Sequence, residues 1–322
     1  MYDVITIGSA TRDIVIRTRA GKLVSTPDDP LAQKVLAFEY GAKIPVLRTY
    51  DNFGGGGCNV AIGLARLGLR VAARVNVGED LEGLRIKKRL NKEKVSVRLL
   101  SWDKKEKSDI SVVIVDEKGS GDHIIFVDKN ASKNLSIGKK KLSTKWAYAS
   151  SLGGEWEKLL SNLQKQAASH KIKIAFNPGS LQLSAGYAGL RKILNFLDIL
   201  IVSLDEAIEL VLSQEKKEKG LTGEELAKKI FSWGPKLVVI TQGARGALAY
   251  NGKDLKKQSA LKVDRVVDTT GAGDAFSAGF VGAHILGKDL DTALTWGVKN
   301  GANVIQEYGA QVGLLKRREF KS

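Results

Sequence analysis

The sequence has little cysteine, methionine, histidine or proline. Of its 322 residues, one is cysteine, one is methionine, three are histidine and five are proline. A single cysteine, Cys58, excludes an intramolecular disulfide and a cysteine-based zinc cluster, and this usage fits a reducing compartment. We expect Cys58 to be a small buried thiol and not a nucleophile, because no histidine follows it at a suggestive spacing.

The three histidines do not form a metal-binding pattern. His123, His170 and His284 lie far apart in the sequence, without the spacing of metal ligands. Surface or packing roles are therefore expected for all three.

Long apolar runs are also lacking. No stretch of about 18 consecutive apolar residues is present, so no membrane span and no membrane partner are expected. The start, MYDVITIGSA, is a strand-like apolar run without a basic region and a small-residue cleavage site. These features predict a cytoplasmic protein.

Acidic residues are outnumbered by basic ones. Lysine and arginine total 51 against 35 acidic residues, a formal charge of +16. Such a surplus attracts nucleic acid, anionic membranes or phosphorylated small molecules. The lysines are scattered through polar runs such as SQEKKEKG (213–220), without interleaved aromatic residues. No nucleic-acid partner is therefore predicted, and nucleic-acid binding is kept as an outside alternative.

Short β-branched apolar runs alternate with helix-like stretches along most of the chain. Continuous apolar runs are typical of buried parallel strands, and the stretches 59–68 and 155–170 read as crossover helices. The pattern predicts a doubly wound α/β fold with a mostly parallel sheet, whose ligands bind at the carboxyl ends of the strands. The predicted strands lie within residues 3–9, 70–78, 146–154, 172–180, 198–206 and 236–246.

Two segments depart from this rhythm and alternate like half-exposed antiparallel strands. They cover residues 12–50 and 95–128, with the run DEKGSGD (116–122) as a hairpin turn. We predict that these segments form a small β-sheet lid inserted into the α/β core. The core then consists of residues 1–11, 51–94 and 129–322.

The first glycine-rich motif is NFGGGGCNVAIGLARLG (52–68). Four consecutive glycines, Gly54 to Gly57, expose backbone N–H groups to which a hydroxyl or an anion can bind. A flexible connection between a strand and a helix explains such a run equally well.

The second motif is DTTGAGDAFSAGF (268–280), which ends in a helix-like run. The first N–H groups of a helix lack intrahelical partners and attract an anion, and an acid such as Asp274 also stabilises a helix start by itself. An ordinary cap does not require glycines directly before it. A general base beside an anion hole does, and phosphoryl transfer depends on both.

The two motifs together, in this order, resemble the two signatures of the ribokinase-like, or PfkB, carbohydrate and nucleoside kinases. The resemblance covers essentially the whole chain and includes FNPGS, TQGARG and YGAQVGLL. It implies the ribokinase-like fold, an ATP-dependent phosphotransferase and Mg²⁺ as a cofactor.

The resemblance implies roles for the residues at matching positions on the acceptor side. Asp274 would be the general base that takes the proton from the acceptor hydroxyl. The anion hole for the transferred phosphoryl group would comprise Gly271, Ala272 and Gly273. The contacts to the sugar would be Asp13, Gly55, Gly56 and Asn59.

It also implies roles on the nucleotide side. Asn177 and Glu206 resemble residues near the phosphates and Mg²⁺, with Glu206 acting through water. The turn on the nucleotide side would comprise Thr241, Gly243 and Gly246. Asp268 and Thr270 match positions whose oxygens, in many members, help to hold a monovalent cation such as K⁺. Asn300 and Asn303 lie in a run that borders the adenine in related kinases, although a polar helix face explains them equally well.

One position departs from the family pattern. The family has Asn-x-x-Glu, and here the run is SLDE, with Ser203 at the position of the asparagine. This puts the Mg²⁺ and phosphate network in doubt. Glu206 is retained, and its alternative role is that of an acid at a helix start.

The predicted function is thus transfer of the γ-phosphoryl group of ATP to a hydroxyl of a sugar or of a nucleoside ribose. The alternative is a non-catalytic sugar- or nucleotide-binding protein with the same fold. The residues of the predicted lid do not decide between a sugar and a nucleoside as the acceptor. A nucleobase would need an apolar wall, for which Phe38, Tyr40 and Phe126 are available, whereas a sugar phosphate would need basic residues, such as Arg17, Arg48 or Lys129. A homodimer formed through the lid is also left open.

Overall fold

An eight-stranded sheet forms the centre of the larger part of the molecule. The computed structural model describes residues 1–25, 34–116, 123–138, 141–214 and 220–320. The strand order is β16-β15-β14-β13-β12-β11-β1-β6, with parallel pairing from β14 to β6 and antiparallel pairing of β15 and β16. The strands are β1 Tyr2–Ile7, β6 Val71–Arg74, β11 Thr144–Ala149, β12 Lys173–Phe176, β13 Ile199–Ser203, β14 Val238–Thr241, β15 Ala247–Tyr250 and β16 Leu255–Gln258.

Each of the six predicted core segments contains a strand of this sheet, so the doubly wound, mostly parallel fold is confirmed. The segment 70–78 is divided. Its first half is β6, whereas β7 (Asn76–Gly78) leaves the sheet and pairs with β8 (Ser101–Asp103).

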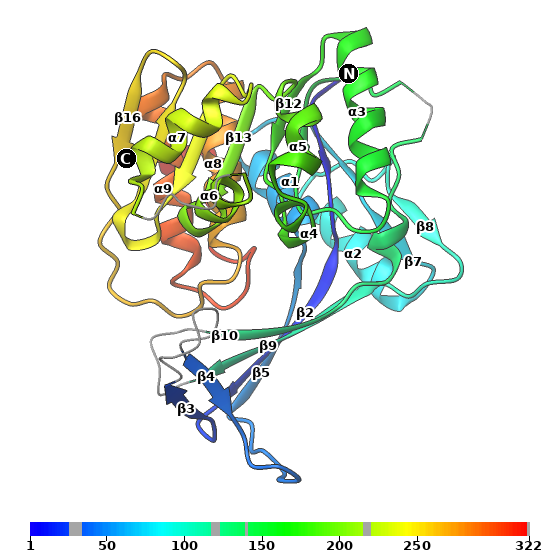
Figure 1. The fold of residues 1–322 in the computed structure, drawn as a ribbon. Helices are drawn as coiled ribbons and strands as arrows, with labels where there is room; N and C mark the ends of the chain where they lie inside the picture. The colour runs from blue at the N-terminus through cyan, green and yellow to red at the C-terminus, as the bar shows by residue number, and fades with distance from the viewer. Residues whose placement is uncertain (26–33, 117–122, 139–140, 215–219, 321–322) are drawn as a thin grey trace.

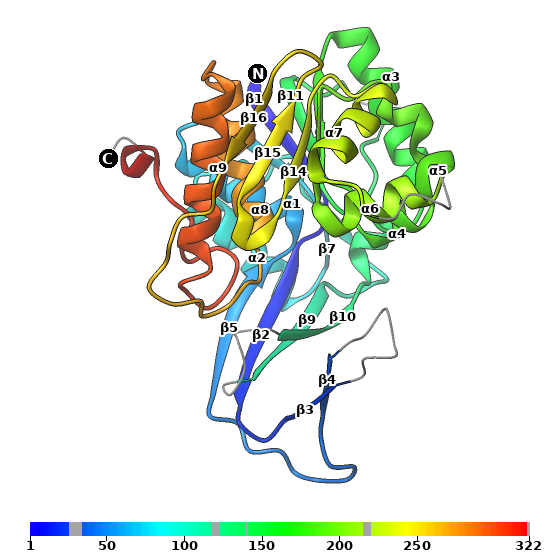
Figure 2. The ribbon, with the colours of Figure 1, turned by 60° about the vertical axis from the view of Figure 1, so that its left-hand side comes forward.

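Helices cover both faces of the sheet, as Figures 1 and 2 show. Alternate residues of β1 enter opposite cores because side chains alternate along a strand: Val4 packs in the core with α1, α8 and α9, and Ile5 in the core with α3, α5, α6 and α7. The helices are α1 Gly56–Arg66, α2 Leu81–Lys92, α3 Trp156–His170, α4 Ser180–Ser184, α5 Gly186–Leu194, α6 Leu204–Leu212, α7 Gly223–Ser232, α8 Ala272–Ile285 and α9 Leu290–Val304. None of these described helices is both long and apolar enough to span a bilayer.

Helix α8 approaches its neighbours closely through glycines. A Cβ on Gly279 would lie 2.5 Å from the carbonyl oxygen of Trp296 in α9, and a Cβ on Gly63 of α1 would lie 2.5 Å from the Cβ of Ala278. Glycine permits this close packing, which fixes α8 and therefore its N-terminus relative to the sheet.

A separate four-stranded sheet extends below the core in Figure 1. Its order is β10-β9-β2-β5, in which the central β2–β9 pair is parallel and both outer pairs are antiparallel. This small sheet is the predicted lid. Its strands are β2 Thr11–Thr18, β5 Arg48–Gly54, β9 Asp109–Asp116 and β10 His123–Asp128; β3 Lys22–Ser25 and β4 Lys34–Ala37 form a separate two-stranded sheet.

Not all of the segments assigned to the lid enter the four-stranded sheet. Residues 95–100 contain none of its strands, because Ser96 forms a bridge to Ala72 of β6 and so extends the core. The predicted turn at 116–122 lies almost wholly outside the described residues. The division into domains at 12–50 and 95–128 stays a prediction.

The lid contacts the core from two sides. On one side Arg12 of β2 pairs with Glu82 of α2 at 3.2 Å. On the other, the ring of Tyr308, which follows α9, stacks on Tyr50 of β5 with the centroids 4.5 Å apart. Tyr308 also packs against a buried cluster of lid residues, Val15, Val113 and Val115.

We expect Gly279→Ala to lower the free energy of unfolding by about 1–3 kcal/mol, because the added methyl group would force α8 and α9 apart. Gly301→Ala in α9 is the matched control. Its Cβ would lie 3.4 Å from the nearest atom, the carbonyl oxygen of Ala272, and alanine favours the helix by roughly 0.5–1 kcal/mol. Urea unfolding measures both changes, and equal effects would contradict the proposed close packing.

Candidate active site

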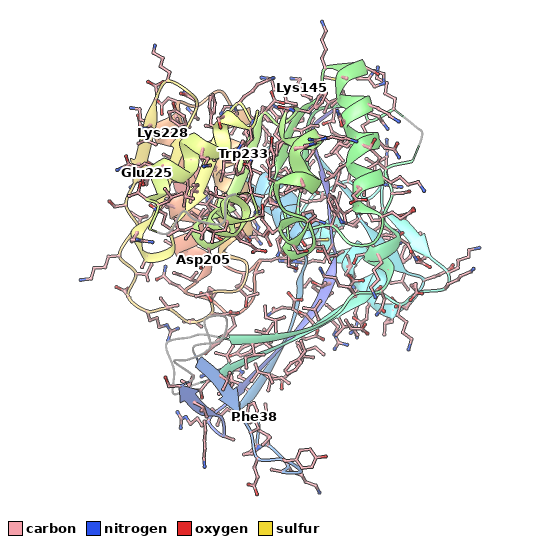
Figure 3. The ribbon with its side chains drawn as sticks, viewed as in Figure 1. Phe38, Lys145, Asp205, Glu225, Lys228 and Trp233 are labelled. Carbon is pink, nitrogen blue, oxygen red and sulfur yellow. The ribbon has the colours of Figure 1, made fainter. Side chains whose placement is uncertain are left out.

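The candidate residues follow the carboxyl ends of neighbouring parallel strands, which meet at one edge of the sheet. Gly8 follows β1, Ser150 follows β11 and Asn177 follows β12, while Ser203 and Thr241 end β13 and β14. Figure 3 shows that Asp205, next to Ser203, lies at the edge of the core nearer the lid, whereas Lys145 at the start of β11 lies at the far edge.

The glycine run connects lid strand β5 to helix α1. Its residues pack closely against residues that precede them in the sequence. Gly55 has a φ of 86°, and a Cβ on it would lie 2.6 Å from the backbone of Ser9. A Cβ on Gly57 would lie 2.8 Å from the backbone of Gly8, and one on Gly54 would lie 1.8 Å from the Oδ2 atom of Asp13. Close packing of the protein's own atoms thus accounts for glycine at these three positions.

The remaining glycine, Gly56, faces the predicted base. A Cβ at this position would lie 3.2 Å from the Oδ1 atom of Asp274 and 2.7 Å from the Oγ atom of Ser150. A side chain at this position would therefore crowd both Ser150 and the Oδ1 atom of Asp274.

Asp13 is a buried carboxylate held by two hydroxyl groups. Its Oδ1 atom accepts hydrogen bonds from Thr11 Oγ1 at 2.9 Å and Ser111 Oγ at 2.5 Å. Burial raises the pKa of Asp13, the two hydroxyls oppose this, and the negative charge of Asp268 adds to the rise. Such a carboxylate is a ready acceptor for the hydroxyl groups of a bound polyol.

Asp274 lies half-buried in the first turn of α8. Asn59 Nδ2 donates a hydrogen bond to its Oδ2 atom at 2.8 Å. Burial raises the pKa of Asp274 to about 6, the hydrogen bond from Asn59 opposes the rise, and repulsion from Asp13 adds to it. The structure therefore brings Asp13, Gly54 to Gly56, Asn59 and Asp274 together around one loop.

The Gly-Ala-Gly segment forms the turn that begins α8. Gly271 is the N-cap residue with a φ of 79°, and a Cβ on it would lie 2.3 Å from the side chain of Ala310. The N–H of Ala272 donates to the carbonyl of Thr269 at 3.2 Å and is thus already engaged. Gly273 is exposed, and a Cβ on it would meet no described atom within 4 Å.

The two predicted cation ligands lie just before this turn. Asp268 is fully buried and accepts hydrogen bonds from the backbone N–H groups of Thr270, at 2.9 Å, and Gly309, at 3.0 Å. Within the described part of the chain, the buried Oγ1 atom of Thr270 has no hydrogen-bond partner. A buried oxygen in this state fits a cation or a water molecule.

Ser203 and Glu206 cap helix α6. Glu206 N–H donates to Ser203 Oγ at 3.2 Å, and Ser203 N–H donates to Glu206 Oε2 at 2.7 Å, which is a capping box. Burial raises the pKa of Glu206, although the hydrogen bonds from Ser203 oppose the rise. The serine that departs from the family pattern therefore acts as the helix cap.

The other residues predicted on the nucleotide side lie apart from the glycine loop in the sequence but along the same edge of the sheet. The side chain of Asn177 donates to the carbonyl of Ile201 at 2.9 Å. Gly243 and Gly246 both have positive φ in the turn from β14 to β15, where a Cβ on Gly246 would lie 2.0 Å from a carbonyl oxygen.

The asparagines of α9 hold the chain that follows the helix. Asn303 donates to the carbonyl of Gly313 at 2.7 Å. Asn300 is buried, donates to the carbonyl of Ala275 and accepts from the N–H of Leu315. The polar-face alternative for Asn300 is therefore wrong, because both ends of its amide are satisfied inside the protein.

Cys58, His170 and His284 lie where the sequence predicts them. Cys58 is buried, and burial together with Asp13 and Asp274 raises its pKa, so a buried thiol is confirmed. His170 ends α3 at the surface, and His284 packs edge-on against Trp146. The side chain of His123 lies outside the described residues. Among the described residues, no three acidic, histidine or cysteine side chains gather as metal ligands do.

Sequence reasoning missed several residues at this site. Ser111 was missed because its role depends on pairing with Asp13 across β2 and β9, and Gln311 because nothing in YGAQVGLL marks its contact with Asn59 at 2.9 Å. The stacked rings of Tyr50 and Tyr308 come from segments 258 residues apart.

The lid aromatics considered for a nucleobase are not on the face of Asp13. Phe126 pairs with Val112, a position that alternates with Ser111, so it lies on the opposite face of the lid. Tyr40 is fully exposed, and Figure 3 places Phe38 at the end of the lid away from the core. Arg17 and Arg48 pair across β2 and β5 on the face of Asp13.

Comparison with known proteins identifies the family of this chain. The model of the pfkB family of carbohydrate kinases matches residues 30–317. An uncharacterized sugar kinase of Archaeoglobus fulgidus is 28% identical over 258 residues, which cover 79% of this chain and 98% of that protein.

Solved structures show the same fold at low sequence identity. A nucleoside kinase of Methanocaldococcus jannaschii, an archaeal member of the ribokinase family, superposes with a TM-score of 0.79 at 20% identity, over 99% of this chain and 97% of the other. The ribokinase of Arabidopsis thaliana complexed with ribose and ATP gives a TM-score of 0.79, 20% identity and the same two coverages. The family match spans every strand of the large sheet except β1, together with the lid strand β5 and both glycine motifs, and this chain belongs to the pfkB family of carbohydrate kinases.

Proposed function

We propose that this protein transfers the γ-phosphoryl group of ATP to a hydroxyl of a sugar or of a nucleoside ribose, with Asp274 as the general base. The observation that carries the proposal is the position of Asp274. Its carboxylate stands at the N-terminus of α8, with Oδ2 held by Asn59 and Oδ1 beside Gly56.

The environment of Asp274 suits proton abstraction. A pKa of about 6 leaves most of the carboxylate ionised at neutral pH, yet makes it a stronger base than an ordinary aspartate. In the proposed reaction the Oδ1 atom accepts the proton of the acceptor hydroxyl as that oxygen attacks the γ-phosphorus. The bond between the γ-phosphorus and the bridging oxygen breaks, and ADP leaves.

The start of α8 supplies the proposed anion hole. The positive end of the helix dipole and the first N–H groups of the helix favour the charge on the transferred phosphoryl group. Gly273 supports this role, because the described structure gives no packing reason for a glycine there. Ala272 would contribute its N–H only by sharing it with Thr269.

Asp13 is the proposed contact to the acceptor. Its buried carboxylate lies beside Gly54 on the glycine loop, and the backbone of Gly55 and Gly56 and the side chain of Asn59 complete the acceptor side. The acceptor is proposed at the level of a sugar or a ribose. Arg17 on the face of Asp13 would suit an anionic group, and the rings of Tyr50 and Tyr308 offer the aromatic surface on that face.

ATP would lie along the carboxyl ends of β12 to β14, towards Asn177, Thr241 and the turn at Gly243 to Gly246, with Asn303 farther along. Mg²⁺ bound with the phosphates would compensate their charge, and it needs no cage of protein carboxylates because it keeps several waters. Glu206 would reach it through water. The buried Asp268 and the unpartnered Thr270 Oγ1 fit a monovalent cation such as K⁺.

The proposal extends to the assembly. The exposed apolar residues Ile125, Phe126 and Val127 of β10 support a homodimer formed through the lid. No nucleic-acid or membrane partner is proposed.

Asp274→Asn is expected to lower turnover by about 10²–10⁴-fold, because an amide cannot take the proton. ADP release with ATP and Mg²⁺ measures this, against ribose, hexoses, hexose phosphates and nucleosides. Asp291→Asn, an exposed first-turn acid of α9, is the matched control and should retain full turnover. Unchanged turnover in Asp274→Asn would contradict the mechanism. An absence of ADP release with every acceptor tested would favour the non-catalytic binding protein.

Asp13→Asn is expected to raise the KM for the acceptor by roughly 10–150-fold, the range for losing a hydrogen bond to a charged group. The amide keeps the shape of the side chain beside Gly54. Asp51→Asn on the exposed face of β5 is the control, and steady-state kinetics with ATP saturating gives both constants. A rise in the KM for ATP, with the KM for the acceptor unchanged, would contradict the proposed contact between Asp13 and the acceptor.

Asp274→Asn should also stabilise the protein above about pH 6. The folded pKa of about 6 lies above the ordinary value of 3.8, so the folded state binds more protons between these values. The contribution of Asp274 to the free energy of unfolding therefore falls as pH rises through this window. Urea unfolding should show a gain from the variant at about pH 8 that shrinks towards about pH 4. A gain independent of pH would contradict the raised pKa.

A further inference from the structure

Asp274 ends a series of hydrogen bonds that begins at helix α2. Asn59 Nδ2 donates to Asp274 Oδ2 at 2.8 Å, and Gln311 Nε2 donates to Asn59 Oδ1 at 2.9 Å. Arg89 Nε of α2 then donates to Gln311 Oε1 at 3.1 Å. The chain joins α8, α1, the segment after α9 and α2.

The direction of this chain follows from the chemistry of its last member. A guanidinium group donates hydrogen bonds and never accepts them, so the oxygen of Gln311 must face Arg89. The amide NH₂ of Gln311 therefore faces Asn59 and occupies its oxygen. Asn59 is left with its own NH₂ towards Asp274, which is the orientation that a carboxylate requires.

Burial makes the alternative orientation costly. Asn59 is 3% exposed and Gln311 is 4% exposed, so neither amide can exchange its partner for bulk water. A reversed Asn59 would turn its oxygen towards the carboxylate of Asp274, and a reversed Gln311 would turn its NH₂ towards Arg89. Both changes would leave buried groups unsatisfied.

Ion pairs anchor the chain at its outer end. Arg89 lies 3.2 Å from Glu93 on the same helix, and Glu93 also pairs with Arg66 of α1 at 2.8 Å. Arg66 in turn donates to the carbonyl of Leu314 at 2.6 Å. The segment that carries Gln311 is thus held to α1 at two residues, Gln311 and Leu314.

We propose that Gln311 is a positioning residue for the base, which holds the Asn59 amide with its N–H towards Asp274 Oδ2 and so directs Oδ1 to the acceptor hydroxyl. This inference rests on the proposed function of Asp274. Gln311 touches neither the acceptor nor ATP in this account and acts through Asn59.

The pKa of Asp274 reports the orientation of the Asn59 amide. Asp13 on β2 repels the carboxylate and raises its pKa, and Cys58 on α1 and Tyr148 on β11 stay neutral because burial raises their own pKa values. The hydrogen bond from Asn59 is the interaction that lowers the pKa of Asp274. A reversed Asn59 amide should therefore raise it further.

Gln311→Glu is the sharpest variant, because a carboxylate still accepts from Arg89 but cannot donate to Asn59. It forces the Asn59 amide to reverse. Gln311→Met, of similar length and without charge, removes the donor without adding repulsion. Gln306→Glu is the matched control, since Gln306 lies half-buried in the same segment and donates to the carbonyl of Ala302 instead.

The first measurement is the titration of Asp274 by carbon NMR of labelled aspartate carboxyl groups, assigned by the signal that disappears in Asp274→Asn. We expect a midpoint near 6 in the unmodified protein, a higher midpoint in both Gln311 variants and no change in Gln306→Glu. Circular dichroism confirms folding, and Gln311→Met serves alone if Gln311→Glu does not fold.

The second measurement is ADP release against pH with the acceptor that supports turnover. The acid limb of kcat/KM should move to higher pH in the Gln311 variants, with a loss of roughly tenfold or more at neutral pH. Folded Gln311 variants that keep both the NMR midpoint and the acid limb would overturn the positioning role. Full turnover in Asp274→Asn would instead overturn the proposed function, and the NMR titration distinguishes the two.

Discussion

The close approach of the loop between β5 and α1 to the loop after β1 is the constraint on which the rest of the site depends. Gly54, Gly55 and Gly57 have no room for a side chain because Asp13, Ser9 and Gly8 lie against them. This contact joins the lid strand directly to a core helix. It also sets the two carboxylates, Asp13 and Asp274, beside the same short backbone, where burial raises both pKa values. Repulsion from Asp268 adds to the rise at Asp13, and repulsion from Asp13 adds to the rise at Asp274.

The segment after α9 acts as a second tie between the parts of the molecule. Tyr308 stacks on the lid residue Tyr50, Gly309 donates its N–H to the buried Asp268, and Gln311 reaches Asn59. One stretch of the polypeptide therefore contacts the lid, the loop before the predicted anion hole and the side chain that binds the predicted base, Asp274. A site built in this way depends on a segment without regular secondary structure, whose position is set by its hydrogen bonds to α9 and α1.

The strands of the core were predictable because a strand buried on both faces must be apolar throughout, and six such runs mark the sheet. The run 95–100 was assigned to the lid because its alternation is the same whether the partner strand is in the lid or in the core. Only the bridge from Ser96 to Ala72 distinguishes them. Ser203, which departs from the family pattern, caps α6 in a capping box with Glu206.

The sequence by itself determined the α/β class, the family and the two glycine motifs, because composition, periodicity and local motifs are properties of neighbouring residues. The acceptor-side and nucleotide-side roles of individual residues stay predictions. The tertiary structure decided which residues meet. The contacts of Asp13 with Ser111, of Asn59 with Gln311 and of Tyr50 with Tyr308 join positions 98, 252 and 258 residues apart. Such contacts leave no periodic signal in one chain, because they arise only when separate elements pack together.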